Sequence, residues 1–107
     1  MRNKATGKEY LTFILDQLSL LEGITSRAMM GEYMIYHRGR LSAYLCDNRL
    51  LVKILPSTQA LLPNAPKKPP YPGAKQMLLV ENVDDRAFLK DLFEAMYPQL
   101  PEPKKKH

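Results

Sequence analysis

Cys46 and His37 are the two residues whose types suggest nucleophilic chemistry. Cys46 is the only cysteine of the chain, and His37 is the only histidine apart from the C-terminal His107. A thiol becomes a nucleophile when an imidazole lies within hydrogen-bond reach and accepts its proton. We expect His37 to end one strand and to face Arg40 across a tight turn, with Cys46 six residues beyond Arg40 on the next strand. At ~3.3 Å per residue the two side chains are about 20 Å apart, so no catalytic dyad is expected.

The other polar residues show no catalytic or metal-binding constellation. One cysteine forms neither a disulfide framework nor a cysteine-rich metal site. The pair Asp84 and Asp85 fits a helix start, and Gly31, Gly39 and Gly73 are isolated, unlike the grouped glycines of phosphate-binding loops. We therefore expect no enzyme, no cofactor and no metal. An enzyme or small-ligand protein is the third of three hypotheses, and it requires a pocket that no polar cluster in the sequence indicates.

The composition is typical of a single domain. The chain has 107 residues, of which 45% are hydrophobic, and a chain of this length buries roughly two thirds of its unfolded surface. We place the domain at residues 1–98, with an ordered body at about 6–97 and a basic, proline-containing, flexible tail at 99–107. No run approaches the ~20 apolar residues of a membrane span, so we expect a cytoplasmic protein without a membrane partner.

The net charge of +5 lies mostly at the two ends of the chain. Arg2 and Lys4 contribute +2, and Glu102 with the three lysines at 104–106 contributes a further +2, which leaves +1 for the body. Dedicated DNA-binding domains concentrate positive charge on the fold itself. The near-neutral body therefore disfavours a DNA-binding domain.

Hydrophobic periodicity and turn residues predict an α+β fold, a two-layer sandwich with N- and C-terminal helices on one face of an antiparallel β-meander. A capping box from Thr6 to Glu9 and a left-handed stop at Gly23 bound the first helix. Asn82 or Asp84 is expected to cap the last helix, and Ser57 the short one. The expected helices are Lys8–Glu22, Thr58–Leu62 and Asp85–Tyr97, and the expected strands are Ser26–Met30, Glu32–His37, Leu41–Cys46, Arg49–Ile54 and Lys75–Val80.

Two-residue turns at Arg38-Gly39 and Asp47-Asn48 set the expected strand register. They pair Tyr36 with Leu41 and Leu45 with Leu50, and directly opposed residues share a face of the sheet. The expected core face carries Met34, Tyr36, Leu41, Ala43, Leu45, Leu50, Val52 and Ile54. The opposite, mixed face carries Tyr33, Ile35, His37, Arg40, Ser42, Tyr44, Cys46, Arg49, Leu51 and Lys53.

Three further segments have less regular patterns. Gly31 interrupts the first strand, which suggests a bulge or a sharp bend. Pro63–Gly73 contains five of the nine prolines and fits an extended connection that Tyr71 could anchor to the body. Phe13 and Leu20 lie outside the inward stripe of the first helix, so they either pack on a second helix or meet a partner chain.

The residues from Arg27 to Tyr36, which read RAMMGEYMIY, resemble the signature Arg-x-Met-Phe-Gly-Gly-Tyr-x-Leu-Tyr of the TfoX (Sxy) N-terminal domain family. The resemblance continues through Asp47-Asn48-Arg49 and covers about Leu11 to Met96, although Met30 replaces the usual Phe and Glu32 the second Gly. It implies a stand-alone N-terminal-like domain from the bacterial cytosol, related to regulators of competence genes that work with a transcription activator. It implies no enzymatic residues.

Two function hypotheses lead. The first is a non-enzymatic regulatory or protein-interaction module in competence-type transcriptional regulation, whose partner is a second copy of the chain or another protein, such as a transcription factor. Its candidate surface combines Phe13 and Leu20 with the mixed face. The alternative is direct nucleic-acid binding by stacking aromatics and cations on that face, helped by the lysine tail. The face residues proposed for these roles are Tyr33, Arg40, Tyr44, Arg49 and Lys53.

Overall fold

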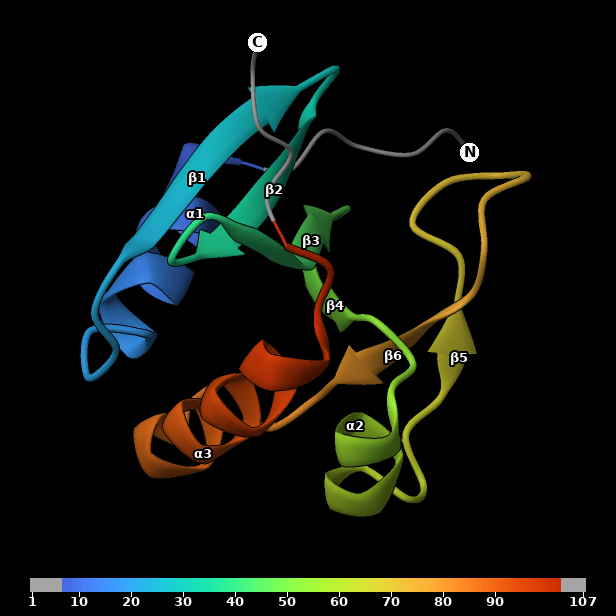
Figure 1. Ribbon diagram of the computed structural model, residues 1–107. Coiled ribbons are helices and arrows are strands. Elements are labelled where there is room, and N and C mark those ends of the chain that lie inside the picture. Colours follow the sequence, from blue (N-terminus) through green and yellow to red (C-terminus); the bar gives the residue numbers. More distant parts are fainter. Residues whose placement is uncertain (1–6, 103–107) are drawn as a thin grey trace, which may run out of the picture.

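An open, antiparallel, six-stranded sheet forms the centre of the structure, a computed structural model that describes residues 7–102 (Figure 1). The strand order is β1-β2-β3-β4-β6-β5. The strands are β1 (Ile24–Met29), β2 (Glu32–His37), β3 (Arg40–Cys46), β4 (Arg49–Val52), β5 (Lys67–Lys68) and β6 (Met77–Val80). The helices are α1 (Lys8–Gln17), α2 (Pro56–Leu61), α3 (Arg86–Met96) and the 3-10 helix η1 (Tyr97–Gln99).

Three two-residue turns connect the first four strands. Both residues of each turn have positive φ: 50° and 84° at Met30-Gly31, 52° and 83° at Arg38-Gly39, and 53° and 56° at Asp47-Asn48. Two left-handed residues make a type I′ turn, whose twist matches that of the flanking strands. The turns predicted at Arg38-Gly39 and Asp47-Asn48 are confirmed. The expected irregularity at Gly31 is a third hairpin turn, and β1 ends at Met29.

A bulge in β3 overturns part of the predicted register. Tyr36 pairs with Leu41 as predicted, but Ile35 pairs with Ala43, so Ser42 is the additional residue between them. An additional residue reverses which side chains of the neighbouring strand face the core. Ile35 is fully buried in the main core and Tyr33 packs against it, whereas Met34 and Tyr36 lie on the opposite face. The prediction had these four residues on the wrong faces. The predicted pairing of β3 with β4, including Ala43 with Val52 and Leu45 with Leu50, is confirmed.

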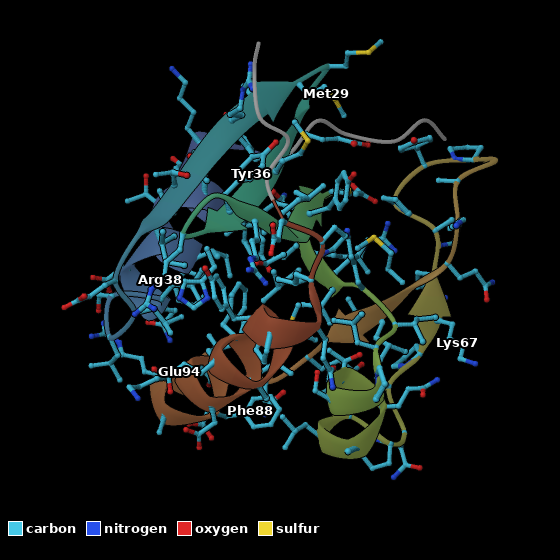
Figure 2. The ribbon with its side chains drawn as sticks, viewed as in Figure 1. Met29, Tyr36, Arg38, Lys67, Phe88 and Glu94 are labelled. Atoms are coloured by element: carbon cyan, nitrogen blue, oxygen red, sulfur yellow. The ribbon has the colours of Figure 1, made fainter. Side chains whose placement is uncertain are left out.

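One face of the sheet packs against α1 and α3, and side chains fill the space between these layers (Figure 2). The residues of α3 that form the predicted apolar stripe, Leu89, Leu92, Phe93 and Met96, are all fully buried. The predicted α+β fold class is therefore confirmed. The main core comprises Ile14, Leu18, Leu21, Ile35, Ala43, Leu45, Leu50, Val52, Leu78, Val80, Leu89, Leu92, Phe93, Met96 and Leu100.

The helix ends differ from the prediction. Helix α1 ends at Gln17, and the following turns still bury Leu18 and Leu21. Gly23 is therefore not a helix stop. Its φ is 76°, its carbonyl accepts a hydrogen bond from the Arg38 amide at 2.8 Å, and a Cβ there would lie 2.9 Å from Cγ of Arg38. Gly7 occupies the N-cap of α1 without a side-chain cap, and the predicted cap residue Thr6 lies outside the described residues.

The caps of the other helices also come from unexpected residues. The Asp85 carboxylate caps α3 by accepting from the Phe88 amide at 3.0 Å, instead of Asn82 or Asp84. The Thr58 hydroxyl, rather than Ser57, accepts from the amide before α2, that of Leu55, at 2.7 Å. Cap residues depend on where the backbone leaves the helical conformation, and this shifts by a residue or two without changing the periodic pattern.

Candidate binding pocket on the far face of the sheet

The face of the sheet opposite α1 and α3, here called the far face, carries a second and smaller apolar cluster. Strand pairing places Arg27, Met34, Tyr44, Leu51 and Leu79 in one row across this face. Cys46, Leu51 and Met77 are buried in the cluster, and Tyr44 and Leu79 pack against it.

The proline-rich segment covers part of the far face and shapes a pocket there. It folds back along the sheet as β5, which pairs with β6, and the Leu79 amide donates to the Pro66 carbonyl at 2.9 Å. The predicted extended connection therefore contains a short strand, β5, that the sequence did not predict. Pro70 is buried, whereas Tyr71 is 48% exposed, so the proline attaches this loop more firmly than the tyrosine does. A turn closed by the Ala74 amide and the Tyr71 carbonyl then leads into β6.

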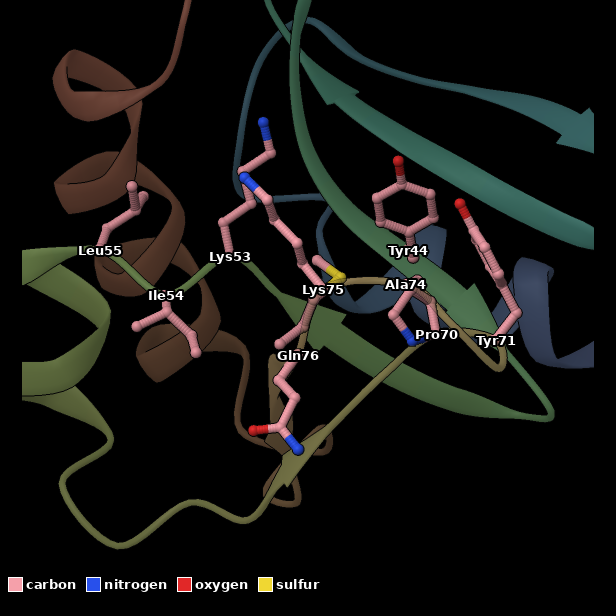
Figure 3. A pocket seen from close by; sticks show the side chains of 10 residues that line it. Tyr44, Lys53, Ile54, Leu55, Pro70, Tyr71, Ala74, Lys75 and Gln76 are labelled. Atoms are coloured by element: carbon pink, nitrogen blue, oxygen red, sulfur yellow. The ribbon is translucent and has the colours of Figure 1, made fainter.

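The pocket has a volume of about 550 Å³ and lies between this loop and the sheet (Figure 3). Tyr44 comes from β3, Lys53 follows β4, and Met77 begins β6, so three strands contribute to its walls. The full lining is Tyr44, Lys53, Ile54, Leu55, Pro70, Tyr71, Ala74, Lys75, Gln76 and Met77.

The polar groups of the pocket include two tyrosine hydroxyls and two lysine ammonium groups. The rings of Tyr44 and Tyr71 stand beside each other with their hydroxyl groups pointing the same way (Figure 3). Burial, and then the neighbouring Tyr71 hydroxyl, raise the pKa of Tyr44. Lys53 and Lys75 extend in a common direction, and neither forms an ion pair with any residue of the range 7–102. Among the described residues that line the pocket, none is acidic.

A smaller hollow of about 240 Å³ adjoins the pocket and shares Pro70 and Tyr71 with it. Arg49 and Lys68 supply two more cations at this hollow. The far face therefore combines apolar surface with basic groups from both the sheet and the loop. Such an arrangement attracts anionic groups attached to an apolar body.

Cys46 and His37 lie on opposite faces of the sheet. Burial, and then the neighbouring Glu32 carboxylate, raise the pKa of the Cys46 thiol to about 12, so the thiolate is scarce at neutral pH. His37 belongs to the helix side, where its ring contacts Phe93 and Tyr97. The prediction that His37 shares the mixed face with Cys46 was wrong because of the bulge at Ser42. The sheet itself separates the thiol from the imidazole.

The residues predicted for an interaction surface fall into three places. Tyr44 and Lys53 line the pocket, and Arg49 lines the smaller hollow. Phe13 and Leu20 are 39% and 52% exposed, away from the far face, in α1 and just after it. Tyr33 and Arg40 lie on the helix side: Tyr33 packs against the main core, and the Arg40 guanidinium donates to the carbonyls of Tyr97 and Leu100. Predicting them on the mixed face was an error of register.

The pocket residues that the sequence pattern missed come from the loop. Pro70, Tyr71, Lys75 and Gln76 approach Tyr44 and Lys53 only because the loop returns along the sheet. The concentration of prolines indicates a stiff connection and Tyr71 a possible point of attachment to the body, but neither feature of the sequence indicates which strand the loop meets.

In residues 7–102, no group of three or more His, Cys, Asp or Glu side chains converges on a metal position. In the same part of the chain, no helix combines the length and apolarity that crossing a membrane requires.

Comparison with known proteins gives a consistent result. The family model of the TfoX N-terminal domain matches residues 16–95. A relative from Spirochaeta aurantia, an uncharacterized 12.7 kDa protein in the trpE 5′ region, is 33% identical over 101 residues, which cover 94% of this chain and 88% of the relative. No solved structure matches.

Proposed function

The chain belongs to the TfoX N-terminal domain family, a family of regulatory type, and from this premise we propose that it acts without catalysis, by binding a partner protein in competence-type transcriptional regulation. The match covers most of the folded body, including the whole sheet. Membership of a fold or family does not specify a binding surface, because function depends on the residues of the site.

The observation that carries the proposal is the far face. Within residues 7–102, helices α1 and α3 pack on the other face of the sheet, and the loop that contains Pro70 and Tyr71 covers part of this one. An apolar cluster rimmed by lysine and arginine is typical of a surface that receives an amphipathic, acidic segment of another protein. Tyr71 lines both the pocket and the smaller hollow on this surface.

Site-specific photo-crosslinking in the native host tests the proposal. A photoreactive phenylalanine replaces Tyr71 in one protein and Met30 in a matched control, because Met30 is 97% exposed at a hairpin tip away from the pocket. We expect a transcription factor or polymerase component to be captured from position 71 and not from position 30. Capture of the same proteins at both positions, or of no such protein at 71, contradicts the proposal.

A second copy of this chain is the other candidate partner. The exposed apolar side chains of Phe13 and Leu20 favour self-association, whereas Leu51 on the far face is already fully buried within one chain. In the crosslinking experiment, a product of twice the monomer mass from position 71 would identify a homodimer instead of a heterologous partner.

The structure weakens the alternative hypothesis of direct nucleic-acid binding, because the residues proposed for it do not all lie on one face of the sheet. Of the five residues proposed for it, Tyr33 and Arg40 lie on the helix side, which leaves Tyr44, Arg49 and Lys53 on the far face. The remaining ring, that of Tyr44, lines a pocket beside the loop instead of an open row of aromatics along which successive bases could stack.

A further inference from the structure

The pocket between Tyr44 and Tyr71 is a concavity within the far face that is large enough to hold a small molecule. Its volume of about 550 Å³ falls in the range of roughly 300–1,000 Å³ typical of ligand pockets. Its walls come from three strands and from a loop whose Pro70 is buried, so the site is formed before any ligand arrives.

The charges of the lining select for an anion. Lys53 and Lys75 both line the pocket, and no acidic side chain among the described lining residues neutralises them. Two ammonium groups at one cavity repel each other, and a bound carboxylate or phosphate replaces this repulsion with two attractions. Each ammonium can donate up to three hydrogen bonds to such a group.

The remaining walls select for a planar or apolar body. The rings of Tyr44 and Tyr71 stand beside each other, and Pro70, Ala74, Ile54 and Met77 supply apolar surface. Aromatic and proline surfaces favour flat ligands that can lie against them. The tyrosine hydroxyl groups add two positions that can donate to an anion or accept from a hydroxyl.

From these features we propose that the pocket is a binding site for a small organic anion, with its carboxylate or phosphate held by Lys53 and Lys75 and its flat body lying against Tyr44 and Tyr71. The proposal goes beyond the partner-binding function and does not rest on it. Because the same loop forms the outer surface around Tyr71, a ligand in the pocket would change the surface that a partner contacts and so regulate what binds there.

Amide chemical shifts of the full chain during titration with benzoate and with phenyl phosphate test the proposal. We expect saturable changes concentrated at residues 44, 53 and 74–77, and much smaller changes with benzyl alcohol, which has the same ring without the charge. Equal changes with benzyl alcohol, or changes spread over surface lysines throughout the chain, overturn the anion site.

Two matched double variants distinguish binding in the pocket from non-specific attraction of anions to the positively charged chain. Lys53→Gln with Lys75→Gln removes the two pocket cations, and we expect the affinity to fall by about tenfold or more, as for the loss of charge-assisted hydrogen bonds. Lys8→Gln with Lys67→Gln removes the same charge at exposed positions outside the pocket and should leave the affinity unchanged. Equal losses in both overturn the proposal.

A third arm distinguishes a free small anion from an acidic side chain of a protein. A blocked Glu-Phe dipeptide amide carries a carboxylate and a ring on a peptide backbone. Tighter binding of this peptide than of benzoate and phenyl phosphate would assign the pocket to a protein segment and contradict the small-molecule proposal. Tyr71→Ala tests whether the Tyr71 ring contributes to the affinity for the ligand, and the variant should fold because Tyr71 is 48% exposed. An unchanged affinity would count against a ligand that lies against this ring.

Discussion

At the scale of single residues, His37 has the least ordinary environment. The residue is 3% exposed, and its ring lies 5.1 Å from the Tyr97 ring and 6.5 Å from the Phe93 ring, edge-on to both. No partner among the described residues satisfies its Nδ1 atom. Burial, and then the charge of Arg38, lower the pKa of His37, although the Phe93 backbone and the Glu94 carboxylate oppose them. The folded chain therefore favours the neutral imidazole.

This environment gives the stability a pH dependence. Below the ordinary histidine pKa of about 6.5 the unfolded chain takes up a proton that the folded chain resists, so the free energy of unfolding falls as the pH falls. The slope is at most ~1.4 kcal/mol per pH unit for one proton, and it ends below the lowered pKa of the folded state. Urea unfolding between about pH 7 and pH 5, above most carboxylate titration, measures it.

The matched variants for this prediction are His37→Gln and His107→Gln, since these are the two histidines of the chain. We expect a flatter pH profile for the first and a profile like that of the wild type for the second. A profile for His37→Gln that runs parallel to that of the wild type would show that His37 does not carry the effect.

At the scale of elements, the three type I′ turns position the strands that bear the pocket. Non-glycine residues take positive φ at Met30, Arg38, Asp47 and Asn48. Asp and Asn tolerate this conformation, because their short side chains hydrogen-bond locally. A methionine has no such compensation, and a left-handed residue with an ordinary side chain costs ~1–2 kcal/mol. Arg38 lacks this compensation as well, so by residue type the Met30-Gly31 and Arg38-Gly39 turns are more strained than the Asp47-Asn48 turn.

Met30→Asn should stabilise the β1–β2 hairpin, because Asn-Gly is the preferred pair for this turn. Met30 is 97% exposed, so the change loses almost no buried surface. We expect the free energy of unfolding to rise by about 0.5–1 kcal/mol, seen as a higher urea midpoint with an unchanged slope. Met30→Val, which places a β-branched side chain at positive φ, should lower the midpoint. Equal midpoints for the two variants would contradict the assignment of strain.

At the scale of the whole molecule, one side chain connects the sheet to the C-terminal segment. Arg40 starts β3, and its guanidinium donates to the Tyr97 carbonyl at 3.0 Å and to the Leu100 carbonyl at 3.2 Å. It also lies 4.3 Å from the centre of the Tyr97 ring. Leu100 is only 4% exposed and belongs to the main core. Residues 97–100 thus close the helix side of the body, and Leu100 packs in the core although it lies within the stretch predicted as a flexible tail, residues 99–107.

Arg40→Lys should loosen this closure. A lysine keeps the charge, but it lacks the planar fork that serves two carbonyls while stacking on a ring. We expect a loss of about 1–3 kcal/mol in the free energy of unfolding and faster proteolysis within residues 97–102. Arg27→Lys, at an exposed position on β1, is the control and should change neither measurement. Resistance to proteolysis equal to that of the wild type would show that Leu100 alone holds the segment.

Several features could be predicted from the sequence because they depend on neighbouring residues. Turn residues with a preference for positive φ determined the hairpins at Arg38-Gly39 and Asp47-Asn48, and the pairing of β3 with β4 followed from the second of them. The 3.6-residue spacing of Leu89, Leu92, Phe93 and Met96 determined the buried side of α3. The signature from Arg27 to Tyr36 was enough to indicate the family that matches residues 16–95.

Other features were decided only by the tertiary structure. Residues 33–36 are apolar or aromatic at every position, so a period of two cannot tell which half is buried, and the bulge at Ser42 made that choice. The pocket required Tyr44 and Lys53 to meet a loop more than fifteen residues further along the chain. Such a meeting depends on strand pairing and on the burial of Pro70. These are contacts between residues distant in the sequence, and no local pattern encodes them.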